Sequence, residues 1–403
     1  NGEAFGLTWY YDILQRNAFG SFRTLLEDVT RSPAMAIYLS MLRNQRPDPA
    51  RGIYPDENYA REVMQLFSIG LNKLHPDGTL VLDTHGLPIP TYTQETISGF
   101  AHVFTGWSYH STAATPNFLY GQRDMLNPLQ MYEAYHDTGD KRALESWVIP
   151  GGGSGTADLQ VTLDMLFEHP NVGPFLCKQL IQRLVTSNPS PGYVHRVARV
   201  FDDNGSGVRG DLGAVVRAIL LDYEARSASA AANPSFGKLR EPLIRVTSLW
   251  RAFGAVPGTS GTYYYSGATT NLGQSPLGAS TVFNFFEPGY VSPGILAAAN
   301  LVAPEFQITT ATTIVLTSNS LRSATFGNLA GVTLDLSAIN AYQDDPAGMV
   351  DWLNMLLMGG SMSDGMRATV IDAVTRISAT AANERARTAI NLVTISPEYA
   401  IQK

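Results

Sequence analysis

Apolar side chains recur every three or four residues along most of the chain, which is the spacing of one face of an α-helix. The clearest case follows Asp56, where Tyr59, Val63 and Phe67 fall on one face of the predicted helix. Asp56 is of a residue type that caps helix N-termini, and Gly70 is of the type that ends helices. The pattern therefore predicts a helix that starts at Asp56 and ends just before Gly70.

The same periodicity predicts helices throughout the rest of the sequence. Two or three short amphipathic segments are expected between residues 5 and 42, with breaks at Gly20 and Pro33. Further helices are predicted over residues 93–107, 157–168, 172–185, 193–201, 212–221, 239–253, 304–318, 347–357, 364–378 and 383–392.

Strand patterns are few. Residues 79–83 and 88–92 flank a short turn and predict a small β-hairpin, which Pro88 and Pro90 weaken. Residues 108–155 and 254–294 are irregular, and neither a sequence repeat nor a nucleotide-binding or nucleophile-elbow motif is present. The predicted fold is all-α, a multi-helical globular domain with one or two minor β-hairpins and long irregular loops. We expect residues 1–403 to form a single domain, with lobes 1–253 and 254–403 as the alternative.

Composition narrows the class of protein. Charged residues make up 16% of the chain, against roughly 25% in an average globular protein. Neutral polar residues must supply the polar surface, a balance often met in exported proteins, and we expect a periplasmic or extracellular location. The net charge is −7 without a basic tract, which argues against a nucleic-acid partner.

The apolar stretches, the first residues and the lone cysteine add three expectations. The apolar stretches are far shorter than the ~20 residues that span a bilayer, so no membrane span is predicted. Residues 1–3 lack an initiator Met and the features of a signal peptide. We expect that the N-terminal part of the precursor is absent. Cys177 has apolar neighbours at helical spacing, which predicts a buried structural thiol.

Several blocks of sequence together form a recognisable pattern. The blocks are PDENYAREVMQLF at 55–67, TYT at 91–93 with FTGW at 104–107, HDTGDK at 136–141, NGSGVRGDL at 204–212, STVFNFF at 280–286, PEFQ at 304–307 and SPEYAIQK at 396–403. They resemble the bacterial family called domain of unknown function 1800, and the later blocks are similar to its longer members. The resemblance covers nearly the whole chain. The resemblance implies a bacterial, often exported protein, and carries over no reaction and no catalytic residues.

The helix after Asp56 carries the first group of candidate residues. Glu57 and Arg61 lie four residues apart, and Asn58 and Glu62 lie on a second polar stripe. One interpretation is an exposed ion pair with acids that complement the helix dipole. The other is a cleft in which Arg61 keeps one carboxylate ionised while a less solvated carboxylate keeps its proton. Glycoside hydrolysis requires two such carboxylates.

The irregular region contains the second group, His136, Asp137 and Lys141. Adjacent His and Asp side chains point in different directions in most backbones, so the two are not expected to pair with each other. Their residue types suit acid–base chemistry, and the alternative is a loop held by Asp-to-backbone hydrogen bonds around Gly139. We expect Glu62, His136 and Asp137 to share one site. The candidate catalytic residues are Glu62, His136, Asp137, Glu57 and Lys141.

Aromatic residues in the irregular regions have two interpretations. Trp107, Tyr109 and Tyr135 suit stacking on sugar rings and, with Asn58 and Arg61, are candidate substrate-binding residues. Filling the core is the alternative, also for residues 263–265 and for Phe285 and Phe286.

No metal site or cofactor is predicted. The seven histidines form no HxxxH or HExxH pair. His102 is expected to be partly buried with its hydrogen bonds satisfied. Residues 202–213 begin like an EF-hand loop but place Gly213 where a bidentate Glu belongs.

Two classes of function remain open. The first is an exported hydrolase that acts on an extracellular polymer, a glycan, by carboxylate and histidine acid–base chemistry. The second is a non-catalytic cell-surface or extracellular assembly protein, whose loops form an interface. A polysaccharide or a protein at the cell surface is the expected partner.

Overall fold

A computed structural model describes residues 2–327 and 329–403 and is mostly helical, as predicted. The chain divides into two compact units. Unit 1 comprises Asn1–Leu184 and Pro189–Ala230, and unit 2 comprises Val185–Asn188 and Ala231–Lys403.

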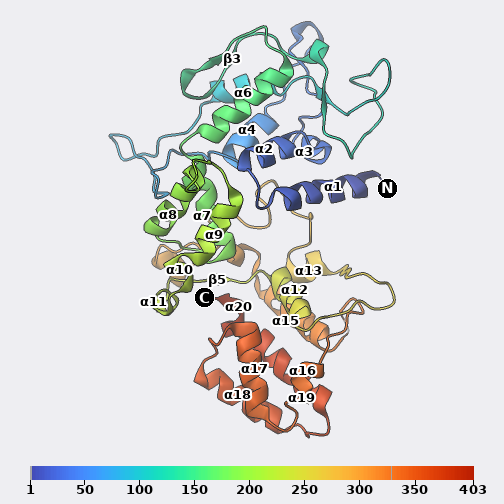
Figure 1. Cartoon of the computed structure of the whole chain (residues 1–403), viewed down its shortest axis with the longest axis vertical. Helices are drawn as coiled ribbons and strands as arrows, with labels where there is room; N and C mark the ends of the chain where they lie inside the picture. Colours follow the sequence, from blue (N-terminus) through green and yellow to red (C-terminus); the bar gives the residue numbers. More distant parts are fainter. Residues whose placement is uncertain (1, 328) are drawn as a thin grey trace. The chain divides into compact units, whose positions relative to one another are not determined.

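Unit 1 is built from helices with four very short strands (Figure 1). Its helices are α1 (Gly2–Asn17), α2 (Phe22–Thr30), α3 (Pro33–Tyr38), α4 (Asn58–Gln65), α5 (Gln94–Val103), α6 (Gly155–Glu168), α7 (Val172–Leu184), α8 (Pro191–Asp202), α9 (Leu212–Leu221) and α10 (Tyr223–Arg226), and α11 (Ala228–Ala232) follows at the junction with unit 2. The 3-10 turns are η1 (Pro49–Arg51), η2 (Glu133–Tyr135) and η3 (Leu144–Ser146).

Side-chain caps explain where several of these helices begin. The Ser154 hydroxyl accepts a hydrogen bond from the Ala157 amide at the start of α6, and the Asp211 carboxylate accepts one from Ala214 at the start of α9. Each bond satisfies an amide that the helix itself leaves free. The glycine-rich residues 204–210 thus form a loop that leads into the Asp211 cap of α9.

Helix α4 is shorter than the pattern predicts. It begins at Asn58, whose amide donates to the Asp56 carboxylate at 2.8 Å, and it ends at Gln65. The amides of Ile69 and Gly70 then both donate to the Met64 carbonyl, and Gly70 has a φ of +70°. The residues predicted as the last helical turn therefore form the helix end instead. There Gly70 has a left-handed backbone conformation, which glycine adopts without strain.

Helix α5 packs against three elements that carry the residues of the site described below. It contacts α4, α6 and strand β3. A Cβ at Gly99 would clash with the backbone carbonyl of Arg142. The glycine therefore lets β3 approach the helix backbone closely.

The predicted irregular layer contains two small antiparallel sheets. Strand β1 (Trp107–Ser108) pairs with β2 (Gln130–Met131), and β3 (Lys141–Arg142) pairs with β4 (Val148–Ile149). The predicted hairpin of residues 79–92 is reduced to isolated bridges such as Leu82 to Pro88. Its prolines lack the amides that a longer ladder needs.

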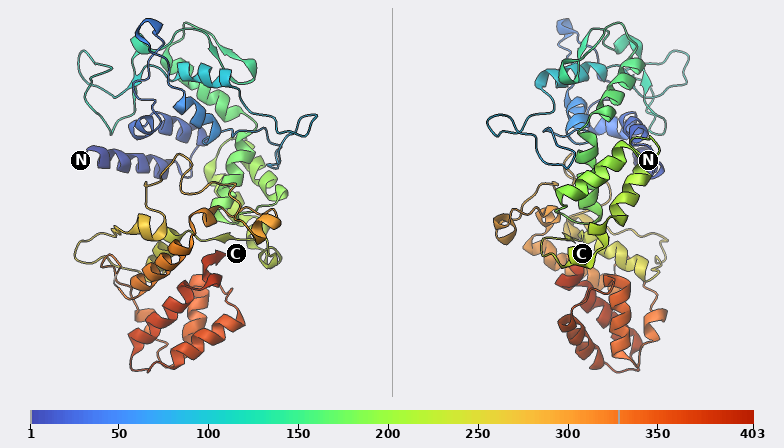
Figure 2. Two further views of the ribbon diagram at one scale, coloured as in Figure 1. Left: turned by 180° about the vertical axis from the view of Figure 1, so that it is seen from behind. Right: turned by 60° about the vertical axis from the view of Figure 1, so that its left-hand side comes forward.

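Unit 2 has a helical core and one further sheet. Its elements are β5 (Lys238–Leu239), α12 (Pro242–Ala252), α13 (Ala268–Leu272), α14 (Ile295–Ala298), η4 (Pro304–Ile308), α15 (Ala311–Thr325), α16 (Ser337–Asn340), α17 (Pro346–Met358), α18 (Asp364–Thr375), α19 (Ala382–Thr394), α20 (Pro397–Ala400) and β6 (Ile401–Gln402). Strand β5 pairs antiparallel with β6. Helices α17, α18 and α19 lie side by side (Figure 2).

The boundary between the units falls near residue 231, whereas the sequence pattern suggested 253–254 for a division into lobes. Helix α12 accounts for the difference because it packs against α13, α15 and α17. Its Val246 and Leu249 are buried in the same cluster as Leu321 and Leu353. The apolar face of α12 therefore belongs to unit 2.

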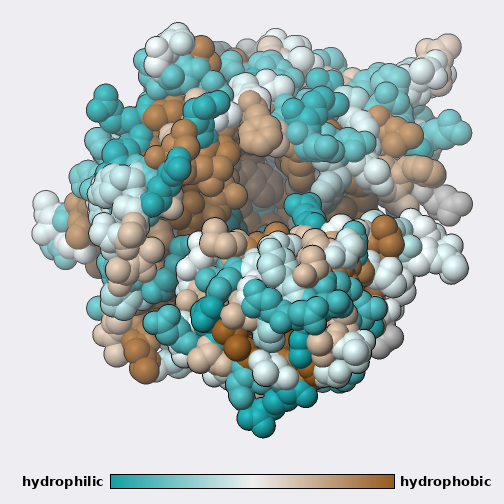
Figure 3. All heavy atoms as spheres, turned by 60° about the horizontal axis from the view of Figure 1, so that its bottom comes forward, coloured by the Kyte–Doolittle hydropathy of each residue, from teal (hydrophilic) through white to brown (hydrophobic). Residues whose placement is uncertain are grey.

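The exposed side of the C-terminal helices is mostly hydrophilic, with single hydrophobic side chains scattered over it (Figure 3). Isolated apolar residues of this kind are normal on a protein surface. In the described ranges, every helix is too short or too polar to cross a membrane.

Candidate functional site

Glu62 is a buried carboxylate of unit 1. It lies on α4 and is 6% exposed, and its Oε2 atom is buried without a hydrogen-bond partner among the described residues. Burial raises the pKa of the Glu62 carboxyl, and the nearby Arg61 offsets only part of that rise. A buried polar atom without a partner is rare in proteins and is often tied to function.

A second carboxylate, Glu57, lies at the N-cap of the same helix in a different environment. Its Oε2 accepts hydrogen bonds from Gln94 at 2.8 Å and from Arg61 at 3.5 Å. Arg61 is half exposed and also acts electrostatically on Glu62 and on Tyr92. These residues, Glu57, Arg61, Glu62, Tyr92 and Gln94, form what we call the Glu62 cluster.

Tyr92 is a part of this cluster that the sequence did not single out. Burial raises the pKa of the Tyr92 hydroxyl, and the charge of Glu62 raises it further while Arg61 lowers it. Its hydroxyl lies 3.4 Å from the Gln65 side-chain oxygen. Asn58, by contrast, is exposed at the first turn of α4.

His136 lies in the interior of unit 1, with 0% of its surface exposed. Its Nδ1 is 2.9 Å from the Thr105 carbonyl oxygen, which only accepts, so Nδ1 is the donor. Its Nε2 faces Asp158 Oδ2 at 3.1 Å. Both ring nitrogens are therefore occupied by protein groups.

Lys141 is bound to the same aspartate. Its Nζ lies 2.7 Å from Asp158 Oδ2 and 2.9 Å from the Gly139 carbonyl oxygen. Asp158 sits in the first turn of α6, where the helix dipole favours a negative charge. His136, Lys141 and Asp158 form a buried charge cluster that ties the irregular layer to α6.

Asp137 points away from its neighbour His136, as expected, and pairs with His102. The His102 Nδ1 lies 2.5 Å from Asp137 Oδ2, and the amide of Gly139 donates to Asp137 Oδ1 at 2.7 Å. Burial tends to raise the pKa of Asp137, but its bonds to the Gly139 amide and to His102 turn the net shift downward. The His102 side chain is 30% exposed.

The candidate residues fall into two separate groups. Glu62 interacts electrostatically with Arg61 and Tyr92. Hydrogen bonds and ion pairs join His136, Lys141 and Asp137 to Asp158, His102 and Thr105. Among the residues that the structure describes, no hydrogen bond or ion pair connects Glu62 to His136 or Asp137. Because His136 and Lys141 are buried, in this conformation they contact only the protein groups that they hold in place.

The candidate sugar-binding aromatics are largely enclosed. Trp107 and Tyr109 are 2% and 6% exposed, under the guanidinium groups of Arg31 and Arg43 respectively. Tyr135 stacks on Phe118 with the ring centroids 4.0 Å apart. These rings fill the interior of unit 1, which is the alternative that the sequence left open.

Sequence reasoning missed Asp158 and did not give His102 a role in the site. Asp158 lies among Leu159, Thr162 and Leu163 on the buried face of α6. An acid on an apolar helix face is the signal that identifies a buried ion pair. His102 has its expected partly buried, hydrogen-bonded environment.

Potential metal ligands do not converge in the described ranges. There, no group of three or more His, Cys, Asp or Glu side chains is arranged to hold an ion. Cys177 is fully buried, and burial raises the pKa of its thiol far above the ordinary range.

Comparison with known proteins gives a family but no activity. No curated protein and no solved structure matches the chain. The profile of the family described as "Protein of unknown function (DUF1800)" matches residues 2–401, essentially the whole chain. The chain therefore belongs to the DUF1800 family.

Proposed function

We propose that this protein is a hydrolase that cleaves a glycan outside the cytoplasm, with Glu62 as the proton donor. The single observation that carries the proposal is the buried Glu62 carboxyl, whose pKa is raised by burial and whose Oε2 has no protein partner in the described chain. A general acid must hold its proton near neutral pH, and burial is the usual way in which a carboxyl achieves this.

Glu57 supplies the second carboxylate in this proposal. Arg61 and Gln94 donate hydrogen bonds to it, and the Arg61 cation offsets its charge. In glycoside hydrolysis the protonated acid gives its proton to the leaving oxygen, while the carboxylate stabilises positive charge on the sugar or activates water. The different environments of Glu62 and Glu57 suit this division of roles.

The buried charge cluster has a supporting role in the same proposal. Lys141 and His136 hold the irregular layer against α6 through Asp158, and Asp137 orients the partly exposed His102. The low share of charged residues supports a location outside the cytoplasm.

The test is an assay of reducing ends released from a panel of bacterial and plant polysaccharides. We expect the wild-type protein to cleave at least one polymer and Glu62→Gln to lose about 100-fold or more of the rate, as removal of a general acid does. The matched control, Glu384→Gln, changes an exposed glutamate and should leave the rate unchanged. Full activity of Glu62→Gln, or no cleavage of any glycan, would contradict the proposal.

One observation favours a second candidate, a non-catalytic protein of the cell surface. The complete burial of His136 and Lys141 is what a purely structural role requires. In that case the chain would bind a polymer without cleaving it, and Glu62→Gln would bind equally well.

A further inference from the structure

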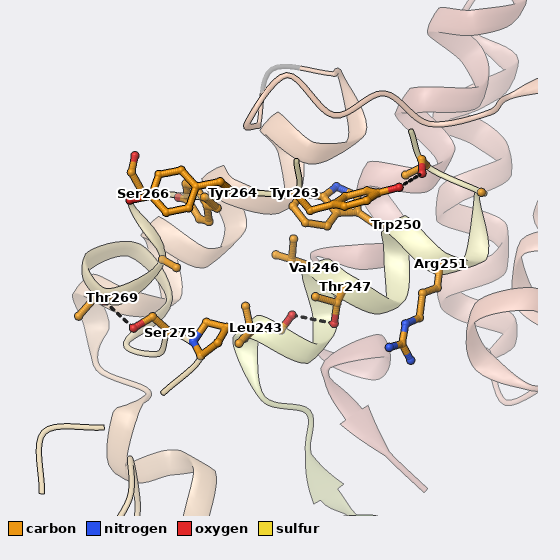
Figure 4. A pocket seen from close by; sticks show the side chains of 15 residues that line it. Leu243, Val246, Thr247, Trp250, Arg251, Tyr263, Tyr264, Ser266, Thr269 and Ser275 are labelled. Carbon is orange, nitrogen blue, oxygen red and sulfur yellow. Dashed lines mark hydrogen bonds between the residues drawn. The ribbon is translucent and has the colours of Figure 1, made fainter. Parts of the chain in front are cut away.

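Unit 2 contains a pocket of about 790 Å³ that the proposed reaction does not use. It is formed by α12, the segment that follows it and α13 (Figure 4). Its volume lies in the range of about 300–1,000 Å³ that is usual for small-molecule sites.

Aromatic rings stand on both sides of this pocket. Trp250 and Tyr263 lie on one side and Tyr264 on the other, with Val246 between them (Figure 4). Tyr263 is held in place because its hydroxyl donates to the Ala255 carbonyl at 2.8 Å and its ring packs against Trp250 at 5.8 Å. Tyr264 is 74% exposed. Aromatic faces of this kind stack on flat apolar surfaces, including the C–H face of a sugar ring.

Polar groups without protein partners lie at the two ends. The hydroxyls of Tyr264 and Ser266 and the guanidinium of Arg251 make no hydrogen bond or ion pair in the described part of the chain. Ser266 and Tyr264 are at one end of the view in Figure 4, and Arg251 is at the other. The lining therefore offers free hydroxyls at one end and a free cation at the other.

Charge selects the kind of ligand. Of the fifteen lining residues, all within the described chain, Arg251 is the only one that is charged at neutral pH. A guanidinium binds carboxylates with paired hydrogen bonds. The complementary ligand has a carboxylate, hydroxyl groups and a flat apolar face.

We propose that this pocket binds an acidic oligosaccharide, a short glycan that contains uronic acid. Its carboxylate binds Arg251, and a sugar ring lies between Tyr264 and the Trp250–Tyr263 pair. Ser266 and the Tyr264 hydroxyl bind sugar hydroxyls. This proposal is independent of the role of Glu62, because the pocket lies in unit 2 and binding needs no turnover.

The test is calorimetric titration of the whole chain with three probes at low ionic strength. The probes are trigalacturonate, the neutral trisaccharide galactotriose, and naphthoate, a flat carboxylate without sugar hydroxyls. We expect trigalacturonate to bind more tightly than either of the others. Titration of Glu62→Gln in parallel removes any turnover, so failure of the hydrolase proposal does not affect this measurement.

Variants then locate the site. Arg251→Gln should weaken trigalacturonate binding by about tenfold, the loss expected for a charge-assisted hydrogen bond. Tyr264→Ala should weaken it several-fold, as expected for a stacking contact. The matched control is Arg376→Gln, an exposed arginine of the same unit outside the pocket, which should have no effect.

Each contrary result overturns the proposal. Absence of trigalacturonate binding, or equal binding by the Arg251 and Arg376 variants, would show that the pocket is not the site. Tighter binding of naphthoate would make it a site for aryl carboxylates. Equal binding of galactotriose, unaffected by Arg251→Gln, would make it a neutral-sugar site.

Discussion

Lys141 and Asp158 form a buried ion pair, with the lysine Nζ 2.7 Å from the aspartate Oδ2. The pair joins strand β3 to the first turn of α6, and His136 completes it from the other side. A buried lysine and a buried histidine thus share one carboxylate, which makes Asp158 the critical member of the cluster.

The first prediction concerns this dependence. Asp158→Asn should destabilise the protein by about 3–5 kcal/mol, because it leaves Lys141 charged and buried without a counter-ion. Asp164→Asn on the same helix is the control, since its carboxylate is 63% exposed and pairs with Arg23 at the surface. That variant should lose at most about 1 kcal/mol. Chemical denaturation measures both, and equal losses would contradict the assignment.

The second prediction concerns the stability cost of Glu62. An acid whose pKa is raised in the native state binds more protons there than in the unfolded chain, at pH values above its ordinary pKa of 4.5. Stability then falls as pH rises through that window. Glu62→Gln has no such loss, so its stability relative to wild type should increase from pH 4 to pH 7, whatever happens to activity. Thermal unfolding across this range measures it, and a gain that is independent of pH would be inconsistent with the buried acid.

The third prediction has the opposite sign and concerns Asp137. Its pKa lies below the ordinary value of 3.8, so its ionised form favours the native state. This stabilising contribution is fully present above pH 3.8. It is lost as the pH falls through the lower pKa that Asp137 has in the native state. Wild type should therefore be more stable than Asp137→Asn at neutral pH, and the difference should shrink only below about pH 4. A difference that already vanishes near pH 6 would refute this account.

The fourth prediction uses two helical glycines. Gly99→Ala places a methyl group against the Arg142 carbonyl and should cost about 1–3 kcal/mol. Gly365→Ala, in the first turn of α18, meets only the Ser363 Oγ atom at 4.0 Å, an ordinary van der Waals contact, and should gain up to about 1 kcal/mol from helix propensity. Unfolding free energies of the two variants should therefore change in opposite directions.

The fifth prediction is that Cys177 does not react in the native protein. Burial raises the pKa of its thiol, and only the thiolate is nucleophilic. A thiol reagent should label one group per chain in denaturant and none within minutes without it. An exposed Ser206→Cys variant is the positive control. Rapid native labelling of the wild-type protein would disprove burial.

The sequence pattern singles out Glu62 because it occupies a polar position beside the apolar face of its helix. In the structure, burial raises the pKa of its carboxyl, and its role in acid–base chemistry stays a prediction. His136, Asp137 and Lys141 were recognised as a cluster in the irregular layer. Their partners Asp158 and His102 come from helices α6 and α5, which no local pattern connects to that layer.

The family, the helical fold class and most helix positions follow from the amino-acid sequence alone. These depend on residues within a few positions of one another, such as the apolar spacing around Val63 and the caps at Ser154 and Asp211. The three-dimensional packing of the chain, in contrast, is what pairs His136 with Asp158 and places Trp107 in the core. It also brought Trp250 and Tyr264 to one pocket. Those outcomes depend on how distant segments pack, because burial and long-range contacts set the partner and the pKa of a side chain, and local sequence does not specify either.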